Sequence, residues 1–246
     1  MTNVLKEDFH MQFRDANERG VIDAKGYLNY FQNQTAKHMY NMRRGNDTLT
    51  QDFGVAWIFA KYRLQNCKMA DFSGPIHAEV WLSNVGRVKL ETDIEFSRDG
   101  EIFCSGRLES CLFDAKKHTL SPLKAAELPD GVQADRRADV DPFSRPSIGA
   151  EDMEYVYTYM VRYADLDNNR HMTNLSYAPM FLNAFGSDFY ENRNIKNLEI
   201  HYINQAFEGE EMKILKSYKD GHAELYACKA DGTKAAWCCM DMEDMA

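Results

Sequence analysis

The spacing of hydrophobic residues in the first half of the chain changes from a helical period towards alternation. Between Gly26 and Gly45 the apolar side chains recur near helical spacing, two arginines occupy the last turn, and Gly45 supplies a stop signal. This pattern predicts an amphipathic helix. From residue 55 onward the period is two and turn signals interrupt it, which predicts antiparallel strands. The predicted strands are residues 55–64, 76–85, 87–96 and 101–114.

The second half repeats this order of helix and strands. After a predicted strand at 154–163 and a polar loop, a helix-like stretch at 175–185 precedes strands at 198–204, 211–218, 223–230 and 234–242. The hairpin signal Asp99-Gly100 has a counterpart in Asp231-Gly232. Pro179 lies inside the second predicted helix, where it should remove a backbone hydrogen bond and bend the axis.

Two similar halves separated by an irregular segment predict an α+β protein with a tandem, or double, hotdog fold. Each half is expected to form an antiparallel sheet that wraps a central helix, and the two sheets are expected to join into one continuous sheet, which would bury their edges. The predicted division is a first hotdog at 1–123, a linker at 124–150, and a second hotdog at 151–246.

Charge and composition narrow the function classes. The chain has 246 residues, a net charge of −9 and 44% hydrophobic residues, which is typical of a globular protein. It has no long apolar run, and its amino terminus is charged where a signal peptide is apolar, so a cytoplasmic protein away from membranes is predicted. The six cysteines form no C-x-x-C pair and are expected to be reduced core residues, with Cys238 and Cys239 alternating along a strand.

The negative charge is concentrated in the second half. Residues 1–130 hold 17 Lys and Arg against 18 Asp and Glu, whereas residues 131–246 hold 12 against 20. No basic stripe of the kind that binds nucleic acid is present. An acidic partner would therefore meet the first half, or the basic pairs Lys116-Lys117 and Arg136-Arg137.

The densest polar sequence is residues 165–174, DLDNNRHMTN, between a predicted strand and a predicted helix. Asp165, Asp167 and Asn169 have the first spacings of a calcium loop, but Arg170 replaces its glycine and Ser176 its closing Glu, which argues against a metal site. Asp, Asn and Thr could instead simply turn and cap the chain before the helix.

A catalytic interpretation of the same residues is also open. If the stretch is extended, the side chains of Asp167, Asn169 and His171 point the same way and could together activate a water and orient a carbonyl. The start of the following helix would supply backbone N–H groups to an oxyanion.

The sequence Asp167-Asn168-Asn169-Arg170-His171, with Asn174 three residues on, resembles the Asp-x-Asn-x-His motif of the acyl-acyl carrier protein (acyl-ACP) thioesterases of bacteria and plants, which are double hotdog proteins. The first predicted helix and the segment Gly54-Val55-Ala56-Trp57 are also similar to that family. The resemblance implies a catalytic second hotdog and a first hotdog that houses the acyl chain.

One position departs from the family pattern. Where the family has Glu in a Tyr-x-x-Glu sequence, this chain has Tyr202-Ile203-Asn204-Gln205. A carboxamide cannot act as a base, so Gln205 could only position water, and proton transfer would fall to His171 or Asp167. Glu208, Glu210 and Glu211 lie nearby but are expected to form a solvated turn.

The resemblance implies a thiolester hydrolase (EC 3.1.2.-) that releases fatty acids from acyl carrier protein in fatty acid biosynthesis, with catalytic residues Asp167, Asn169, His171 and Gln205. It implies no cofactor and no metal, acyl carrier protein as partner, and a possible homodimer. Two alternatives stay open: an acyl-CoA thioesterase with the same residues, and a non-catalytic hotdog protein that binds acyl groups.

Overall fold

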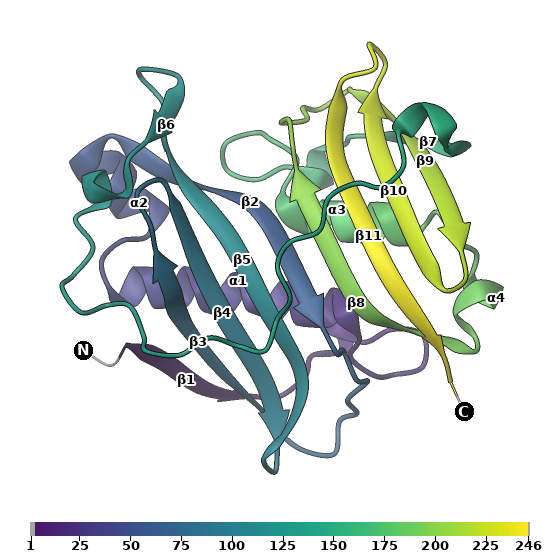
Figure 1. Cartoon of the computed structure of the whole chain (residues 1–246), viewed down its shortest axis with the longest axis horizontal. Coiled ribbons are helices and arrows are strands. Elements are labelled where there is room, and N and C mark those ends of the chain that lie inside the picture. Colours follow the sequence, from purple (N-terminus) through teal and green to yellow (C-terminus); the bar gives the residue numbers. More distant parts are fainter. Residues whose placement is uncertain (1–2, 246) are drawn as a thin grey trace. The chain divides into compact units, whose positions relative to one another are not determined.

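The computed structural model describes residues 3–245 and divides into two compact units, Met1–Asp141 (unit 1) and Pro142–Ala246 (unit 2). The boundary lies inside the segment 124–150. Each unit is an antiparallel sheet with a helix across one face (Figure 1). Within residues 3–245, no helix combines the length and the apolar character needed to span a bilayer.

Unit 1 has the strand order β1-β3-β4-β5-β2, and the short β6 pairs with β5. Its strands are β1 (Val4–Phe9), β2 (Val55–Gln65), β3 (Ile76–Val85), β4 (Lys89–Arg98), β5 (Glu101–Asp114) and β6 (Thr119–Ser121). Its helical elements are η1 (Phe13–Asp15), α1 (Ala24–Asn41), α2 (Asn46–Thr48), η2 (Leu49–Phe53) and η3 (Leu123–Ala126).

Unit 2 has the strand order β7-β9-β10-β11-β8, which is the order of unit 1 in its corresponding strands. Its strands are β7 (Glu154–Met160), β8 (Arg193–Tyr202), β9 (Glu211–Lys219), β10 (His222–Lys229) and β11 (Lys234–Asp244). Its helical elements are η4 (Ala150–Asp152), η5 (Tyr163–Asp165), α3 (Asn174–Leu182) and α4 (Ser187–Tyr190). The repeated layout predicted from the sequence is therefore present as a repeated topology.

Helix α1 differs from the prediction at both ends. It begins at Ala24, because the carboxylate of Asp23 accepts hydrogen bonds from the N–H groups of Lys25 and Gly26. It ends at Asn41 and not at Gly45, since Arg43 takes the left-handed conformation (φ 56°) and turns the chain there. The helix packs closely on its sheet: a Cβ at Gly106 of β5 would lie 2.9 Å from the Phe31 ring.

Helix α3, with nine residues, is half as long as α1, which has eighteen, and contains Pro179, as expected from the sequence. The strands β1 and β6 are not among the predicted strands. Cys238 and Cys239 lie on β11 at alternating positions, and all six cysteines are buried thiols.

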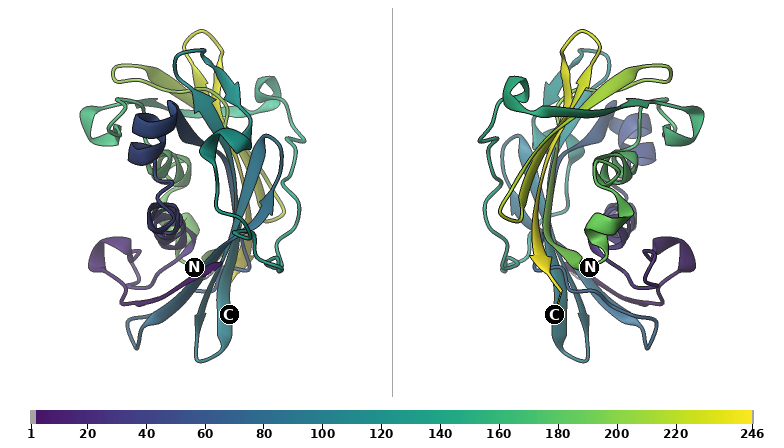
Figure 2. Two further views of the ribbon diagram at one scale, coloured as in Figure 1. Left: turned by 90° about the vertical axis from the view of Figure 1, so that its left-hand side faces the viewer. Right: turned by 90° about the vertical axis from the view of Figure 1, so that its right-hand side faces the viewer.

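The segment 124–150, which connects the two units in the sequence, crosses the face of each sheet that is opposite to the helix (Figure 2). In unit 1, Ala134, Ala138 and Val140 pack on Trp81. A buried ion pair holds this segment, because Arg107 binds Asp93 through two bonds of 2.8 and 2.9 Å and also donates to the carbonyls of Ala138 and Val140.

In unit 2, two buried carboxylates hold the segment that precedes β7. Glu199 accepts from the N–H of Ser144 at 2.8 Å, and Glu224 accepts from the N–H of Ser147 and from Trp237 Nε1 at 3.0 Å. These bonds explain how the two carboxylates stay buried.

Candidate active site

The polar loop 165–174 connects η5 to α3 in unit 2 and is closed by Asp165. The two carboxylate oxygens of Asp165 accept hydrogen bonds from Tyr159 Oη (2.7 Å) and from the N–H of Arg162 (2.8 Å). Its carbonyl accepts from the N–H of Thr173 at 2.7 Å, which brings the two ends of the loop together. The side chain and the carbonyl of Asp165 thus both stabilise the loop. Within residues 3–245, no three His, Cys, Asp or Glu side chains are placed to hold a metal ion.

Asp167 organises a tight turn inside this loop. Its N–H donates to the carbonyl of His171 (2.8 Å), and the N–H of Arg170 donates back to the carbonyl of Asp167 (3.0 Å). One carboxylate oxygen of Asp167 accepts from the N–H groups of Asn169 (2.8 Å) and His171 (3.2 Å). Arg170 has φ 61°, so the expectation of an extended stretch with alternating side chains is wrong.

The turn places His171 against the segment that carries Gln205. His171 forms an antiparallel bridge with Phe207, and the N–H of Met172 donates to the carbonyl of Ala206 at 2.8 Å. The rings of His171 and Phe207 meet edge to face, with centroids 5.0 Å apart. The bridge therefore places the segment that contains Gln205 next to His171, and the turn at Asp167 directly precedes His171. Asp167, Asn169 and Gln205 are exposed and His171 is half-buried.

The start of α3 lies directly after the turn. In the described part of the chain, its N-cap residue Thr173 makes no side-chain hydrogen bond to the first turn, whereas Asp23 caps α1 with its carboxylate. The first turn of α3 is thus not closed by its own cap, which leaves the positive end of the helix suited to a developing oxyanion.

Two tyrosines, Tyr177 within α3 and Tyr202 at the end of β8, meet near the start of α3. Tyr202 Oη donates to the carbonyl of Asn174 at 3.1 Å, and the rings of Tyr177 and Tyr202 meet edge to face at 5.3 Å. Burial raises the pKa of both phenols well above the usual value. Both phenols therefore stay neutral and support the helix start by packing and hydrogen bonding.

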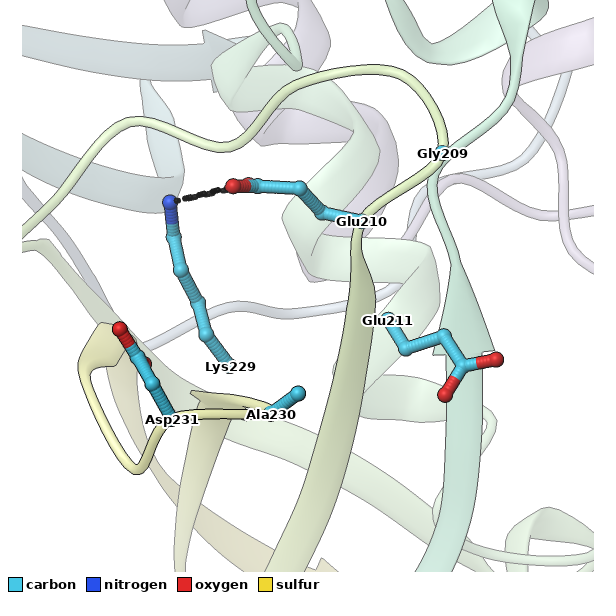
Figure 3. Close-up of a pocket in the computed structure, with 6 residues that line it drawn as sticks. All are labelled: Gly209, Glu210, Glu211, Lys229, Ala230 and Asp231. Carbon is cyan, nitrogen blue, oxygen red and sulfur yellow. Dashed lines mark hydrogen bonds and ion pairs between the residues drawn. The ribbon is translucent and has the colours of Figure 1, made fainter.

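Two charged residues beside the site were not predicted from the sequence. Glu210 belongs to the acidic run expected to be solvated, yet its carboxylate pairs with Lys229 Nζ at 2.9 Å and accepts from the N–H of Phe207 at 3.0 Å. Figure 3 shows the two side chains pointing toward each other beside a surface pocket of about 420 Å³. Because Lys229 is far from Glu210 in the sequence, no local pattern could have indicated the pair.

Unit 1 contains the same turn without the same chemistry. Asn17 Oδ1 accepts from the N–H groups of Arg19 (3.0 Å) and Val21 (3.4 Å), and Gly20 has φ 71°. The N–H of Asn17 donates to the carbonyl of Val21 at 2.9 Å, as Asp167 does to His171. Val21 therefore stands where unit 2 has His171.

Residues 149–236 match the family model of the acyl-ACP thioesterase C-terminal domain, and this range includes the turn, His171 and Gln205. The resemblance to acyl-ACP thioesterases is thus confirmed, and it supports thioester hydrolysis. No curated protein matches the chain in sequence.

Two solved structures are similar over nearly the whole chain. An acyl-ACP thioesterase from Bacteroides thetaiotaomicron superimposes with a TM-score of 0.87 at 16% identity and covers 98% of each chain. A 12:0-ACP thioesterase from Umbellularia californica does so with a TM-score of 0.89 at 15% identity, over 99% of this chain and 98% of the other. At such identities the likeness shows the fold, and the predicted double hotdog fold is confirmed.

Proposed function

We propose that the chain is a cytoplasmic thioester hydrolase that releases free fatty acids from acyl carrier protein in fatty acid biosynthesis. The observation that carries this proposal is the turn at Asp167, which sets His171 beside the segment of Gln205 and just before the start of α3, where the Thr173 side chain forms no cap. These residues all lie in the range that matches the thioesterase family model.

In the proposed mechanism His171 removes a proton from a water molecule that attacks the thioester carbonyl. Asp167 holds the backbone of His171 and places a negative charge beside the imidazolium that forms. Gln205 positions the water, Asn169 orients the carbonyl, and the first N–H groups of α3 stabilise the oxyanion. The same His171 then protonates the departing thiolate. Water is the only co-substrate, and no cofactor is needed.

The first half is proposed to receive the acyl chain. An apolar cluster in unit 1 joins the end of α1 to the sheet and includes Met39, Met42, Leu49 and Trp57. Trp57 is fixed there by two hydrogen bonds, from its N–H to Asn46 Oδ1 (2.6 Å) and from Nε1 to the carbonyl of Arg44 (2.9 Å).

Of the two basic pairs, Lys116-Lys117 is the better docking candidate for an acidic carrier. Arg136 already binds Glu79 and lies over the Trp81 ring at 3.7 Å, and Arg137 binds Glu91. Both arginines are thus already paired with carboxylates of unit 1. Lys116 and Lys117 are exposed, and Lys117 alone of the two is paired, with Asp114 at 2.9 Å.

The test is hydrolysis of lauroyl and palmitoyl thioesters on acyl carrier protein and on CoA, with wild type and His171→Val. The expected result is a loss of at least about a hundredfold in kcat for the variant, the range typical of a general base. Equal rates for the two proteins would refute the assignment. A preference for CoA esters would favour the acyl-CoA alternative, and bound lipid without turnover would favour the acyl-binding alternative.

A further inference from the structure

Phe207 links His171 to charged residues that take no part in the proposed chemistry. On one side its backbone forms the bridge with His171, and its ring meets the imidazole at 5.0 Å with an angle of 88° between the planes. On the other side its N–H donates to Glu210 Oε2 at 3.0 Å, and the ammonium of Lys229 lies 5.6 Å from its ring centroid. The ring is 43% exposed, so packing alone does not fix it.

Glu210 and Lys229 are themselves held in place. Lys229 Nζ lies 3.0 and 2.9 Å from the two oxygens of Glu210, and the side chains are 17% and 32% exposed for Lys229 and Glu210. The carbonyl of Glu210 accepts from the N–H of Val161, and the N–H of Gly209 donates to the carbonyl of Val161, both at 3.0 Å. Figure 3 shows that neighbouring Glu211 points away from the pair.

We propose that the Glu210–Lys229 ion pair positions His171 through Phe207. Glu210 fixes the backbone of Phe207, and Lys229 fixes its ring. The Phe207 ring in turn restricts the orientation of the His171 imidazole. This inference rests on the proposed function of His171, since positioning matters to a rate only if His171 touches the reacting groups. Glu210 and Lys229 are positioning residues and not catalytic residues, because they act through Phe207.

The chain offers a matched control in the same unit. Lys216 is also 17% exposed, pairs with Glu154 at 3.3 Å, and lies over an aromatic ring, that of Phe185, at 4.6 Å. A substitution of Lys216 therefore removes an ion pair and a ring contact like those of Lys229, together with a hydrogen bond to the carbonyl of Ala184 at 3.2 Å, without touching Phe207. Any general loss of stability should be common to the two lysine variants.

The experiment compares Lys229→Met, Lys229→Arg, Glu210→Gln and Lys216→Met in the full chain. Two measurements are made on each: kcat and KM with a lauroyl thioester, and the ¹H–¹³C spectrum of protein with ¹³C-labelled histidine. The chain has seven histidines, and the His171 signals are assigned by their loss in His171→Val. Glu210→Gln keeps an acceptor for the Phe207 N–H and serves as the second test if Lys229→Met does not fold.

We expect Lys229→Met to shift the His171 signals and to lower kcat by about ten- to a hundredfold, as small misplacements of reacting groups do, with KM nearly unchanged. Glu210→Gln should act in the same direction, Lys229→Arg should restore most of kcat, and Lys216→Met should change neither measurement. Unchanged His171 signals and kcat in a folded Lys229→Met, or equal effects in Lys216→Met, would overturn the proposal. If wild type hydrolyses no thioester, the proposed function fails, while the His171 signals still report whether the pair positions the ring.

Discussion

Asp167 has two separable roles, and the structure provides the substitution that separates them. Its carboxylate accepts two backbone N–H groups, and in the proposed mechanism its charge acts on His171. Asn17 makes the same two bonds in unit 1 with a neutral amide oxygen. Asp167→Asn should therefore keep the turn and remove only the charge, whereas Asp167→Ala should remove both.

The expected magnitudes follow from the two bonds. Because Asp167 is exposed, each bond contributes as a cap does at a helix end, so Asp167→Ala should lower the free energy of unfolding by about 1–2 kcal/mol. For a chain of this size that corresponds to a fall of about 2–8 °C in Tm. Asp167→Asn should change Tm by less than about 2 °C, since a side-chain oxygen remains to accept both bonds. It should still lower kcat at least about tenfold, because the imidazolium loses its neighbouring charge.

Thermal unfolding and thioester hydrolysis are measured on both variants and on Asn17→Ala. Asn17→Ala breaks the corresponding turn in unit 1 and should lower Tm without lowering kcat. If Asp167→Asn has wild-type kcat/KM, Asp167 only shapes the backbone and its catalytic role is wrong. If it loses as much Tm as Asp167→Ala, the equivalence with Asn17 is wrong.

Three further predictions concern the stability of the fold. Arg107→Met leaves the buried Asp93 carboxylate without its ion-pair partner, so it should lower the free energy of unfolding, measured in urea, by about 3–5 kcal/mol. Lys68→Met breaks an exposed pair with Glu101 and should lower it by about 1 kcal/mol or less. Similar losses in the two variants would contradict the role of burial. Burial raises the pKa of Tyr157 to about 12, so its phenol stays protonated in the folded protein at a pH where the unfolded chain ionises. The free energy of unfolding should therefore fall as the pH rises from 10 towards 12, and it should fall less steeply in Tyr157→Phe. All six cysteines are buried, so a thiol reagent should modify them slowly in the native protein and fully after unfolding; rapid modification of the native protein would show that this part of the structure is wrong.

The sequence predicted the long strands well and the short ones poorly. β2, β3 and β5 match their predicted ranges within one residue, because alternation marks them and a glycine lies one or two residues before each of them. β1 was missed because its sequence VLKEDF is half charged, and it is recognisable as a strand only through its pairing with β3. A pairing partner 67–77 residues away in the chain leaves no trace in the local spacing of hydrophobic residues.

In the site, the motif did not predict the conformation of the loop. The carboxylate of Asp167 reaches the N–H groups two and four residues on, and such local bonds compete with an extended backbone. The acidic run at Glu210 resembled a solvated turn because the partner of Glu210, Lys229, lies 19 residues further on, at the end of β10. Both errors come from bonds that alternation and composition do not describe.

The duplicated turn also shows what distinguishes the two halves chemically. Both halves need this turn to lead from η1 or η5 into a helix, so its presence alone is no sign of catalysis. In unit 1 the Asp23 side chain caps the helix, and Val21 lies at the end of the turn. In unit 2 the Thr173 side chain forms no cap, and His171 lies at the end of the turn. Since valine occupies this position in unit 1 with the turn intact, His171→Val is the substitution that the fold should tolerate. Wild-type Tm together with lost hydrolysis is the expected result, and a large fall in Tm would mean that His171 is held for stability.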